Sequence, residues 1–246
     1  MDKLYMIIPA YNEAANIENT VREWIRIPQA IGGGARLCVI DDGSKDETFS
    51  ILSRLADELP ELEVIRKKNG GHGAAVLFGY KYALEMGADY VFQTDSDGQT
   101  RPREFAQFWK LRHDYDMVIG YRRGRKDGLS RIMVTRVLKA VIRLCFGVSV
   151  QDANTPFRLM TAESLRENIS YIPEDFNLSN VVLSVIYAKR QEPVKYIPIT
   201  FRQRQGGKNS INLKKIFFIG LNALRDFRRI NKELESELSG DDNDAV

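Results

Sequence analysis

The chain has 246 residues, of which 43% are apolar, so we expect one main domain with a sizeable hydrophobic core. The formal charge of +3 hides a basic body, because residues 233–246 carry six acidic side chains and no lysine or arginine, which leaves +9 on residues 1–232. The longest mostly apolar stretch, Ile216–Leu224, is about half of the ~20 residues that span a bilayer, and residues 1–8 lack the pattern of a secretory signal. We therefore expect neither a transmembrane segment nor an export signal.

Short apolar runs alternate with stretches of helical spacing from the N-terminus onward. Strands are predicted at residues 4–8, 37–40, 62–65 and 90–93, and each is followed by a helix, near residues 17–25, 51–59, 75–87 and 103–113. Two further strands are predicted at residues 117–119 and 194–201. This alternation predicts an α/β fold with a mostly parallel sheet, which binds its ligand at the carboxyl ends of the strands.

Two helices with basic faces are predicted near residues 131–146 and 212–230. Residues 122–143 contain eight basic side chains and one acid, and the bases recur at helical spacing opposite valine, leucine and isoleucine. Such helices suit an anionic membrane surface, although the apolar face of a helix more often packs on a core. We expect the folded domain to end near residue 230 and residues 231–246 to form an acidic, disordered tail.

An acidic motif, Asp95-Ser96-Asp97, follows the predicted strand at residues 90–93. Two carboxylates one residue apart can hold one hard divalent cation, and such a cation neutralises a diphosphate as it leaves. The alternative is an ordinary turn, because aspartate, serine and glycine are common turn residues. A calcium loop is argued against, because Thr100 stands where that loop needs glycine and Ala106 where it needs glutamate.

Two other polar segments follow predicted strands. Asp41 and Asp42 end the second strand, where a carboxylate can accept hydrogen bonds from a base or ribose, or can simply cap the next helix. The loop Asn69–Gly73 suggests close approach of the backbone to a phosphate or sugar, but Val76 breaks the glycine pattern of dinucleotide-binding proteins. Each signal is weak alone, and all of them lie at the same predicted edge of the sheet.

Taken in order, these motifs resemble the family 2 glycosyltransferases. The resemblance rests on Pro9–Glu13, on Asp41–Ser44 with Asp46 and Thr48, on Asn69–Gly73 and on Asp95–Gln99. It covers roughly residues 3–230 and implies the GT-A type of fold, a Rossmann-like α/β/α sandwich that binds a nucleotide. The later segments look most like the dolichol-phosphate mannose synthases and their bacterial polyprenyl-phosphate relatives; they are Gly120–Arg122, Arg131 with Thr135, Asp152–Arg158 and Arg204–Ser210. This chain departs from that branch at residues 153–156, where the branch typically reads Pro-Thr-Ser-Gly and this chain reads Ala-Asn-Thr-Pro.

The resemblance implies roles for individual residues. It assigns the nucleotide-sugar to Pro9, Ala10, Tyr11, Glu13, Asp41, Asp42, Gly71, Asp95, Ser96 and Gln99. It assigns Mg²⁺ or Mn²⁺ to Asp95, Asp97 and Gln99, and the acceptor phosphate to Arg122, Arg131, Thr135 and Arg204. The catalytic residues would be Asp95, Asp97, Arg122 and Arg131, with Asp175 added where the acceptor is a hydroxyl.

The activity that the resemblance implies is metal-dependent, inverting transfer of a sugar from a UDP- or GDP-sugar to a polyprenyl phosphate, by a cytoplasmic protein peripheral on an anionic membrane. A lipid phosphate is already anionic and needs no general base, whereas a hydroxyl of a glycan or lipid-linked saccharide does, and Asp175 could supply it. A nucleotide-sugar binding protein without turnover is a further alternative. We expect no nucleic acid as partner, because no aromatic-interleaved basic strand or recognised motif supports one.

Overall fold

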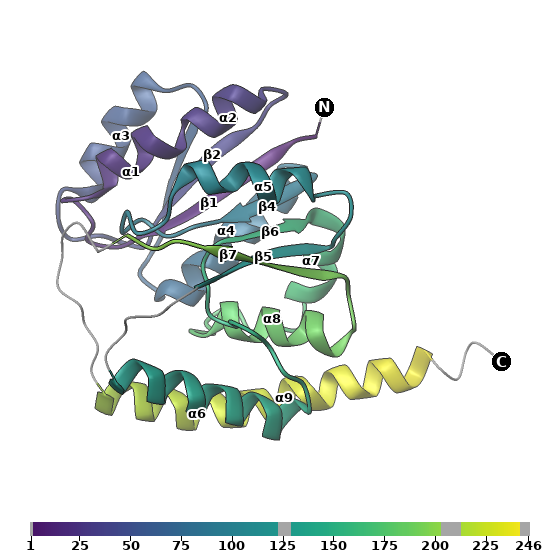
Figure 1. Ribbon diagram of the computed structural model, residues 1–246. Helices are drawn as coiled ribbons and strands as arrows, with labels where there is room; N and C mark the ends of the chain where they lie inside the picture. Colours follow the sequence, from purple (N-terminus) through teal and green to yellow (C-terminus); the bar gives the residue numbers. More distant parts are fainter. Residues whose placement is uncertain (1, 123–128, 203–212, 242–246) are drawn as a thin grey trace.

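The computed structural model describes residues 2–122, 129–202 and 213–241. Its centre is a seven-stranded sheet with the order β3-β2-β1-β4-β6-β5-β7 (Figure 1). The strands are β1 (Leu4–Ala10), β2 (Arg36–Asp41), β3 (Leu62–Arg66), β4 (Tyr90–Gln93), β5 (Met117–Arg122), β6 (Arg158–Thr161) and β7 (Val194–Ile199). β6 runs antiparallel to both of its neighbours, and the other neighbouring pairs are parallel. The predicted α/β fold with a mostly parallel sheet is therefore confirmed.

Helices cover both faces of the sheet (Figure 1). One face carries α1 (Ile17–Trp24), α2 (Arg26–Ile31), α3 (Thr48–Glu58), the 3₁₀ turn η1 (Pro102–Glu104) and α5 (Phe105–Lys110), and the other carries α4 (His72–Glu85), α7 (Ala162–Ile169) and α8 (Ser179–Lys189). Successive side chains of β1 alternate between the two cores, because a strand has a period of two: Tyr5 and Ile7 face α4, whereas Met6 and Ile8 face α1. All seven residues of β1 are buried as a result.

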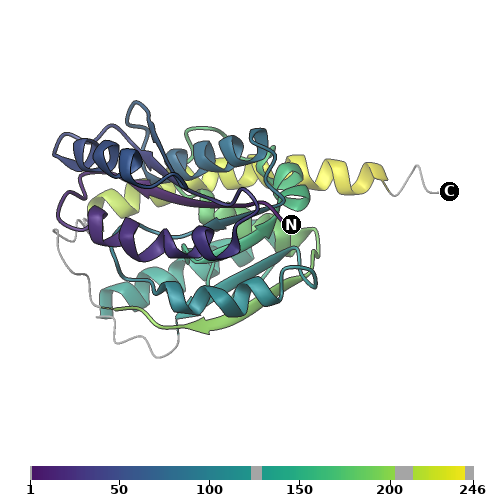
Figure 2. The ribbon, with the colours of Figure 1, turned by 90° about the horizontal axis from the view of Figure 1, so that it is seen from above.

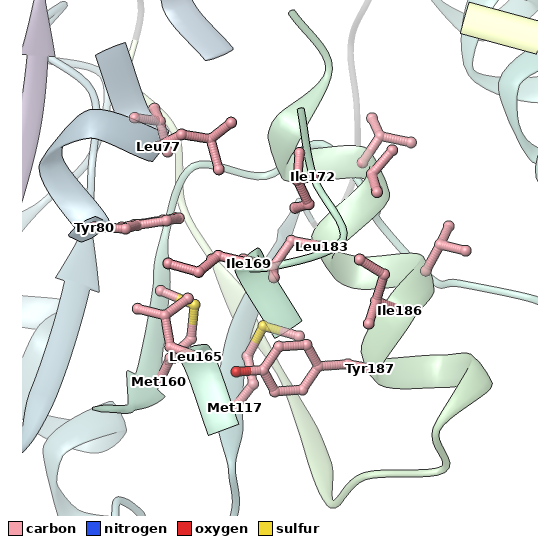
Figure 3. Close-up of a cluster of buried hydrophobic side chains, with 14 of the residues drawn as sticks. Leu77, Tyr80, Met117, Met160, Leu165, Ile169, Ile172, Leu183, Ile186 and Tyr187 are labelled. Carbon is pink, nitrogen blue, oxygen red and sulfur yellow. The ribbon is translucent and has the colours of Figure 1, made fainter. Parts of the chain in front are cut away.

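The hydrophobic core under α4, α7 and α8 holds α4 in place, and α4 is the helix that reaches the carboxyl edge of the sheet. Figure 3 shows side chains from the three helices converging on Met117 and Met160 of the sheet. The buried Tyr187 hydroxyl is paired with Ser164 Oγ at 2.7 Å, so its polar atom has a partner. Gly79 lets α4 lie directly on β1, since a Cβ at this position would be 2.4 Å from Ile7. The N-terminus of α4 is thereby held at the edge where β1, β2 and β4 end.

Two long helices, α6 (Leu129–Phe146) and α9 (Leu213–Asp241), pack against each other beside α8 (Figure 1). They occur where the two basic helices are predicted from the sequence. Phe146 and Phe227 join them with ring centroids 5.3 Å apart, and Phe176 contacts the same Phe227 ring at 6.0 Å. Within the described residues no helix is long and apolar enough to cross a membrane.

The disordered tail expected from residue 231 is wrong for residues 231–241. These residues continue α9, whose end extends beyond the rest of the fold in Figure 2. Leu234 is fully buried and prolongs the apolar stripe of Phe227 and Ile230 at helical spacing. Two of the acids that suggested a tail face basic or hydroxyl partners instead: Glu235 pairs with Lys189 at 2.8 Å, and Glu237 accepts a hydrogen bond from Tyr171. Residues 242–246 lie outside the described residues.

Candidate active site

A cleft of about 260 Å³ opens at the carboxyl ends of β1, β2 and β4. It is lined by Pro9, Ala10, Tyr11, Glu13, Asp42, His72, Ala75, Asp95, Ser96 and Asp97. Eight of these ten residues are among those that the resemblance assigns to the donor or the metal. The structure therefore brings together residues from four motifs that are up to 88 positions apart in the sequence.

The loop after β4 holds its carboxylates in a fixed turn. The backbone N–H of Gln99 donates to Asp97 Oδ1 at 3.1 Å, and the hydroxyls of Thr94 and Thr100 are paired across the turn at 2.7 Å. Thr20 of α1 donates to the carbonyl of Ser96 at 3.0 Å. These bonds restrain the backbone between Asp95 and Asp97, so the two side chains are presented to the cleft by a structured loop.

His72, the first residue of α4, is a cleft residue that sequence reasoning left unassigned. Its Nε2 lies 3.0 Å from Asp95 Oδ1, and its side chain is about half exposed, at 51%. Desolvation opposes protonation, but the nearby carboxylates of Asp95, Asp42 and Asp97 outweigh it, so the pKa of His72 is raised above its usual value. The sequence feature that could have placed His72 in the cleft is its position, because it begins a helix at the same sheet edge as the acidic motif.

Asp42 is buried, at 2% exposure. Its carboxylate organises the loop Asn69–Gly73, the glycine loop. Asp42 Oδ1 accepts from the backbone N–H of Gly70 at 2.9 Å, and Oδ2 accepts from that of Gly71 at 2.8 Å. Lys67 Nζ lies 2.6 Å from Oδ1. Gly71, predicted to bind the nucleotide-sugar, is absent from the cleft lining, and its N–H is directed to Asp42 rather than to the cleft.

Asp41 faces away from the cleft. It is fully buried, its Oδ1 accepts from the N–H of Ser44 at 3.3 Å, and its Oδ2 lies 3.3 Å from Arg66 Nε. The predicted contact of Asp41 with the nucleotide-sugar is therefore not supported by its position. The reason is the period of two along a strand, because neighbouring side chains at the end of β2 point to opposite sides.

Gln99, predicted as a metal ligand, also lies outside the cleft lining. Its side-chain amide donates to the carbonyl of Arg202 at 3.3 Å, and the N–H of Arg202 donates back to its carbonyl at 2.8 Å. Arg122 ends β5 with its guanidinium 4.2 Å from the centre of the Phe201 ring. Thr135 is a partly buried residue of α6. The side chain of Arg131 and the whole of Arg204 lie outside the described residues.

The loop that carries Asp175 lies directly on the glycine loop. A Cβ at Gly73 would be 2.1 Å from the carbonyl oxygen of Phe176, and a Cβ at Gly71 would be 2.6 Å from Asn177 Oδ1. Only glycine permits this approach, since both distances are far below van der Waals contact. Asp175 is exposed and precedes Phe176 by one residue, so it lies close to the N-terminus of α4.

Arg158 ends the segment that departs from the polyprenyl-phosphate branch, and it is completely buried. Its guanidinium donates to the carbonyls of Ala153, Thr155 and Asn180 and to the hydroxyl of Ser184, at 2.8–3.3 Å. Burial lowers its pKa from the usual value. Arg158 thus binds the loop 152–157 to the start of α8 and is not available to a ligand.

The residues present fit a divalent cation at the acidic loop. Carboxylate oxygens are the ligands that hard cations prefer, and Asp95 and Asp97 both line an open cleft where water or ligand oxygens can complete a coordination shell. Within residues 2–122, 129–202 and 213–241 no group of three or more histidine, cysteine, aspartate or glutamate side chains is arranged to hold a metal ion. The described part of the chain therefore offers a cation the two carboxylates of Asp95 and Asp97.

Comparison with known proteins identifies the family. Residues 5–169 match the model of the family described as glycosyl transferase family 2, so the chain belongs to that family, as the motifs predict. One relative is the undecaprenyl-phosphate 4-deoxy-4-formamido-L-arabinose transferase of Sodalis glossinidius, 23% identical over 88% of this chain and 65% of the relative's length. Another is the undecaprenyl-phosphate mannosyltransferase of Micrococcus luteus, 27% identical over 85% of this chain and 88% of the relative.

A solved structure supports the GT-A fold. The glucosyl-3-phosphoglycerate synthase of Mycobacterium tuberculosis superposes with a TM-score of 0.67 over 94% of this chain and 80% of that chain, at 18% identity. That protein was crystallised with Mn²⁺, UDP-glucose and phosphoglyceric acid. At this identity the likeness concerns the fold alone.

Proposed function

We propose that the chain transfers a sugar from a nucleoside-diphosphate sugar to a polyprenyl phosphate, with inversion at the anomeric carbon and with a divalent cation. The observation that carries the proposal is that Asp42, Asp95 and Asp97 line one cleft at the carboxyl edge of the sheet. The chain is a member of glycosyl transferase family 2. The named relatives in Sodalis and Micrococcus, which are transferases to undecaprenyl phosphate, favour the same acceptor.

The cleft residues have separate tasks in this reaction. Tyr11, 42% exposed, offers a ring face on which a base can stack, and Asp42 offers acceptor oxygens to its edge. The N-terminus of α4, whose residues His72 and Ala75 line the cleft, contributes positive potential beside the diphosphate. A cation held by Asp95 and Asp97 would neutralise the charge that develops on the leaving nucleoside diphosphate. An acceptor phosphate oxygen then forms the new bond to the anomeric carbon from the opposite face while the bond to the diphosphate breaks.

Transfer can be tested directly with purified protein. A set of UDP-sugars and GDP-sugars is incubated with Mn²⁺ and a short polyprenyl phosphate. We expect the protein to consume one of these donors and to form a glycosylated lipid phosphate. Chelation with EDTA should abolish the transfer, and fresh Mn²⁺ should restore it. Binding of a nucleotide-sugar without transfer to any acceptor would instead support the non-catalytic alternative.

The hydroxyl acceptor makes a different prediction for Asp175. Since a lipid phosphate needs no general base, Asp175→Asn should leave the rate of transfer to polyprenyl phosphate within about threefold of the original rate. A base that deprotonates a hydroxyl contributes about 10²-fold or more, so transfer to a saccharide hydroxyl that falls by this factor in Asp175→Asn would support the hydroxyl acceptor instead. The measurement is the initial rate with each acceptor at saturating donor. The neighbouring Glu174, which pairs with Lys81 at 2.6 Å, is kept unchanged.

The proposed location is the cytoplasmic surface of a membrane, and the outer face of α6 supports binding to a membrane surface. Leu144 is 83% exposed and Val137 is 57% exposed, seven residues apart on one helix face. Three bases of the same helix, Arg136, Lys139 and Arg143, are also exposed. The helix α9, which packs against α6, carries the exposed bases Arg225, Arg228 and Arg229. An apolar stripe flanked by arginine and lysine is typical of helices that lie in the interface of an anionic bilayer.

Leu144→Ser should weaken binding to vesicles that contain anionic phospholipid by about tenfold, because burial of one leucine contributes about 1.5–3 kcal/mol. Co-sedimentation with vesicles measures the partition. The matched control is Met86→Ser, which removes an exposed apolar side chain at the end of α4 and should leave binding unchanged. Equal losses in both variants would remove α6 as the membrane-binding face.

A further inference from the structure

A groove runs between α2 and α5, on the face of the sheet that carries α1 and α3. It has a volume of about 610 Å³, and a second hollow of about 510 Å³ continues it, since Ala30, Ile31 and Trp109 line both. We call the two hollows together the α2–α5 groove. Among the described residues, none lines both this groove and the active-site cleft. The apolar lining of the groove consists of Ile27, Ala30, Ile31, Pro102, Phe105, Ala106 and Trp109.

Each wall of the groove presents an apolar stripe. Ile27 and Ile31 on α2 are four residues apart, as are Phe105 and Trp109 on α5, so each pair shares one helix face. The Trp109 ring is held in place, because it stacks on Phe105 with centroids 5.8 Å apart and carries the guanidinium of Arg112 at 4.4 Å. Ile27, Ile31 and Trp109 are nevertheless only partly buried. Two facing stripes with a groove between them leave room for the apolar side of a third helix.

The rim of the groove is basic. Only two acids line it, and each is already paired: Glu23 with Arg202 at 3.0 Å, and Asp2 with Arg112 at 2.7 Å. Three further bases of the rim are exposed and form no ion pair with any described residue; they are Arg26, Arg103 and Lys110. The groove therefore combines an apolar floor with an excess of positive charge.

The neighbouring surface of α1 and α3 shows that exposed bases on this side of the fold are otherwise paired. Arg22 and Arg54 each contact both Glu18 and Glu58, at 2.8–3.0 Å. An apolar surface with a polar rim is typical of a site for a partner, and unpaired bases favour an acidic one. The excess charge is thus a property of the groove and not of the whole face.

The groove is turned away from the helices with the exposed basic side chains. In Figure 1, α2 and α5 lie on one side of the sheet, whereas α6 and α9 lie on the other side, where α6 packs on α8. When α6 lies on a membrane, the α2–α5 groove faces the solvent. This placement favours a protein over a lipid as the occupant of the groove.

We propose that the α2–α5 groove binds a short acidic amphipathic helix of another protein. The apolar side of that helix packs on Ile31 and Trp109, and its carboxylates lie beside Arg26, Arg103 and Lys110. The proposal does not depend on the proposed function, because the groove is separate from the active-site cleft. It describes how a partner can be held on the enzyme at a distance from its substrates.

Three synthetic peptides of about 15 residues, long enough to form a helix, are the probes. The first carries leucine on one helix face and glutamate on the other, the second has lysine in place of glutamate, and the third has the composition of the first in a shuffled order. Tryptophan fluorescence reports binding, because the chain has two tryptophans and Trp24 is buried at 1% exposure, which leaves Trp109 as the accessible one. The first peptide should bind at least about tenfold more tightly than the other two, because only it matches both the apolar floor and the charge of the rim.

Two variants separate the contributions of charge and shape. Arg103→Glu combined with Lys110→Glu reverses the charge of the rim, and Ala106→Arg keeps the positive charge but fills the groove with a long side chain. Each should weaken binding of the first peptide by about tenfold or more, since either charge complementarity or apolar burial is lost. The control Arg166→Glu, at an exposed position of α7 on the other face of the sheet, should bind as the unaltered chain does.

The proposal is overturned if none of the peptides binds, if the lysine or shuffled peptide binds as tightly as the first, or if either groove variant binds normally. Two further measurements test other occupants. A dimer in sedimentation velocity that dissociates in Ala106→Arg would assign the groove to a second copy of this chain. Loss of binding to anionic vesicles in the same variant would assign it to a membrane, and either result would also overturn the proposal.

Discussion

Asp97→Asn is expected to lower the rate of sugar transfer by roughly 10²–10³-fold, the size of effect seen when one electrostatic stabiliser of a developing charge is removed. An amide keeps the oxygen that accepts from the N–H of Gln99, so the turn after β4 should be preserved. The substitution removes the negative charge that a divalent cation requires. Calorimetry should therefore show that Mn²⁺ no longer strengthens the binding of the nucleoside diphosphate.

The same change at an exposed position serves as the control. Asp57 lies on the outer side of α3 and outside the cleft, so Asp57→Asn should leave both turnover and Mn²⁺-dependent binding unaltered. Turnover that stays within a few-fold in Asp97→Asn would contradict the assignment of Asp97 to the metal. In that case the acidic loop would be an ordinary turn, the alternative that its composition allows.

Much of the cleft could be predicted because its residues belong to short polar motifs, and each of these motifs directly follows a predicted strand. Apolar runs of four to seven residues define the strands, and the carboxyl ends of parallel strands meet at one edge of the sheet. Any polar motif that follows such a strand is therefore placed near the others. Pro9, Asp42 and Asp95 meet in the cleft for this reason.

Side-chain direction at this edge was predictable in principle but was missed. Asp41 and Asp42 are adjacent at the end of β2, so only one of them can face the cleft. The partner on each side, Arg66 for Asp41 and Lys67 for Asp42, comes from the end of β3. Pairs of this kind depend on the register between two strands, and the sequence of either strand alone does not contain that information.

The second half of the chain was predicted less well because its elements depend on distant contacts. β6 is four residues long and antiparallel, and α7 and α8 follow it without a strand between them, so the alternation that identifies the first half is missing. Residues 231–241 have the composition of a solvated tail, yet two of their acids, Glu235 and Glu237, meet Lys189 and Tyr171 of another layer. Composition describes a segment and says nothing of the surface on which it packs.

Arg158→Met should lower the free energy of unfolding by about 3–5 kcal/mol, because methionine fills part of the volume but supplies no donors. Replacement of a buried charge is often tolerated when its partners are replaced with it. Here three of the partners are backbone carbonyls, of Ala153, Thr155 and Asn180, and no single substitution can remove them. Each carbonyl would remain buried without its donor, and that desolvation is the source of the loss.

Urea denaturation followed by circular dichroism measures this change, with Arg166→Met as the matched control. Arg166 is exposed on α7, and the same substitution there should change the stability by no more than about 0.5 kcal/mol. A loss as small as the control's in Arg158→Met would mean that water can replace the guanidinium, and that the loop 152–157 is held by other contacts. A loss of the expected size would make Arg158 the link between this loop and α8, whose preceding loop carries Asp175 and packs on the glycine loop of the cleft. The arginine that ends the Asp152–Arg158 motif would then act on the active site through the fold, by fixing the loops around it.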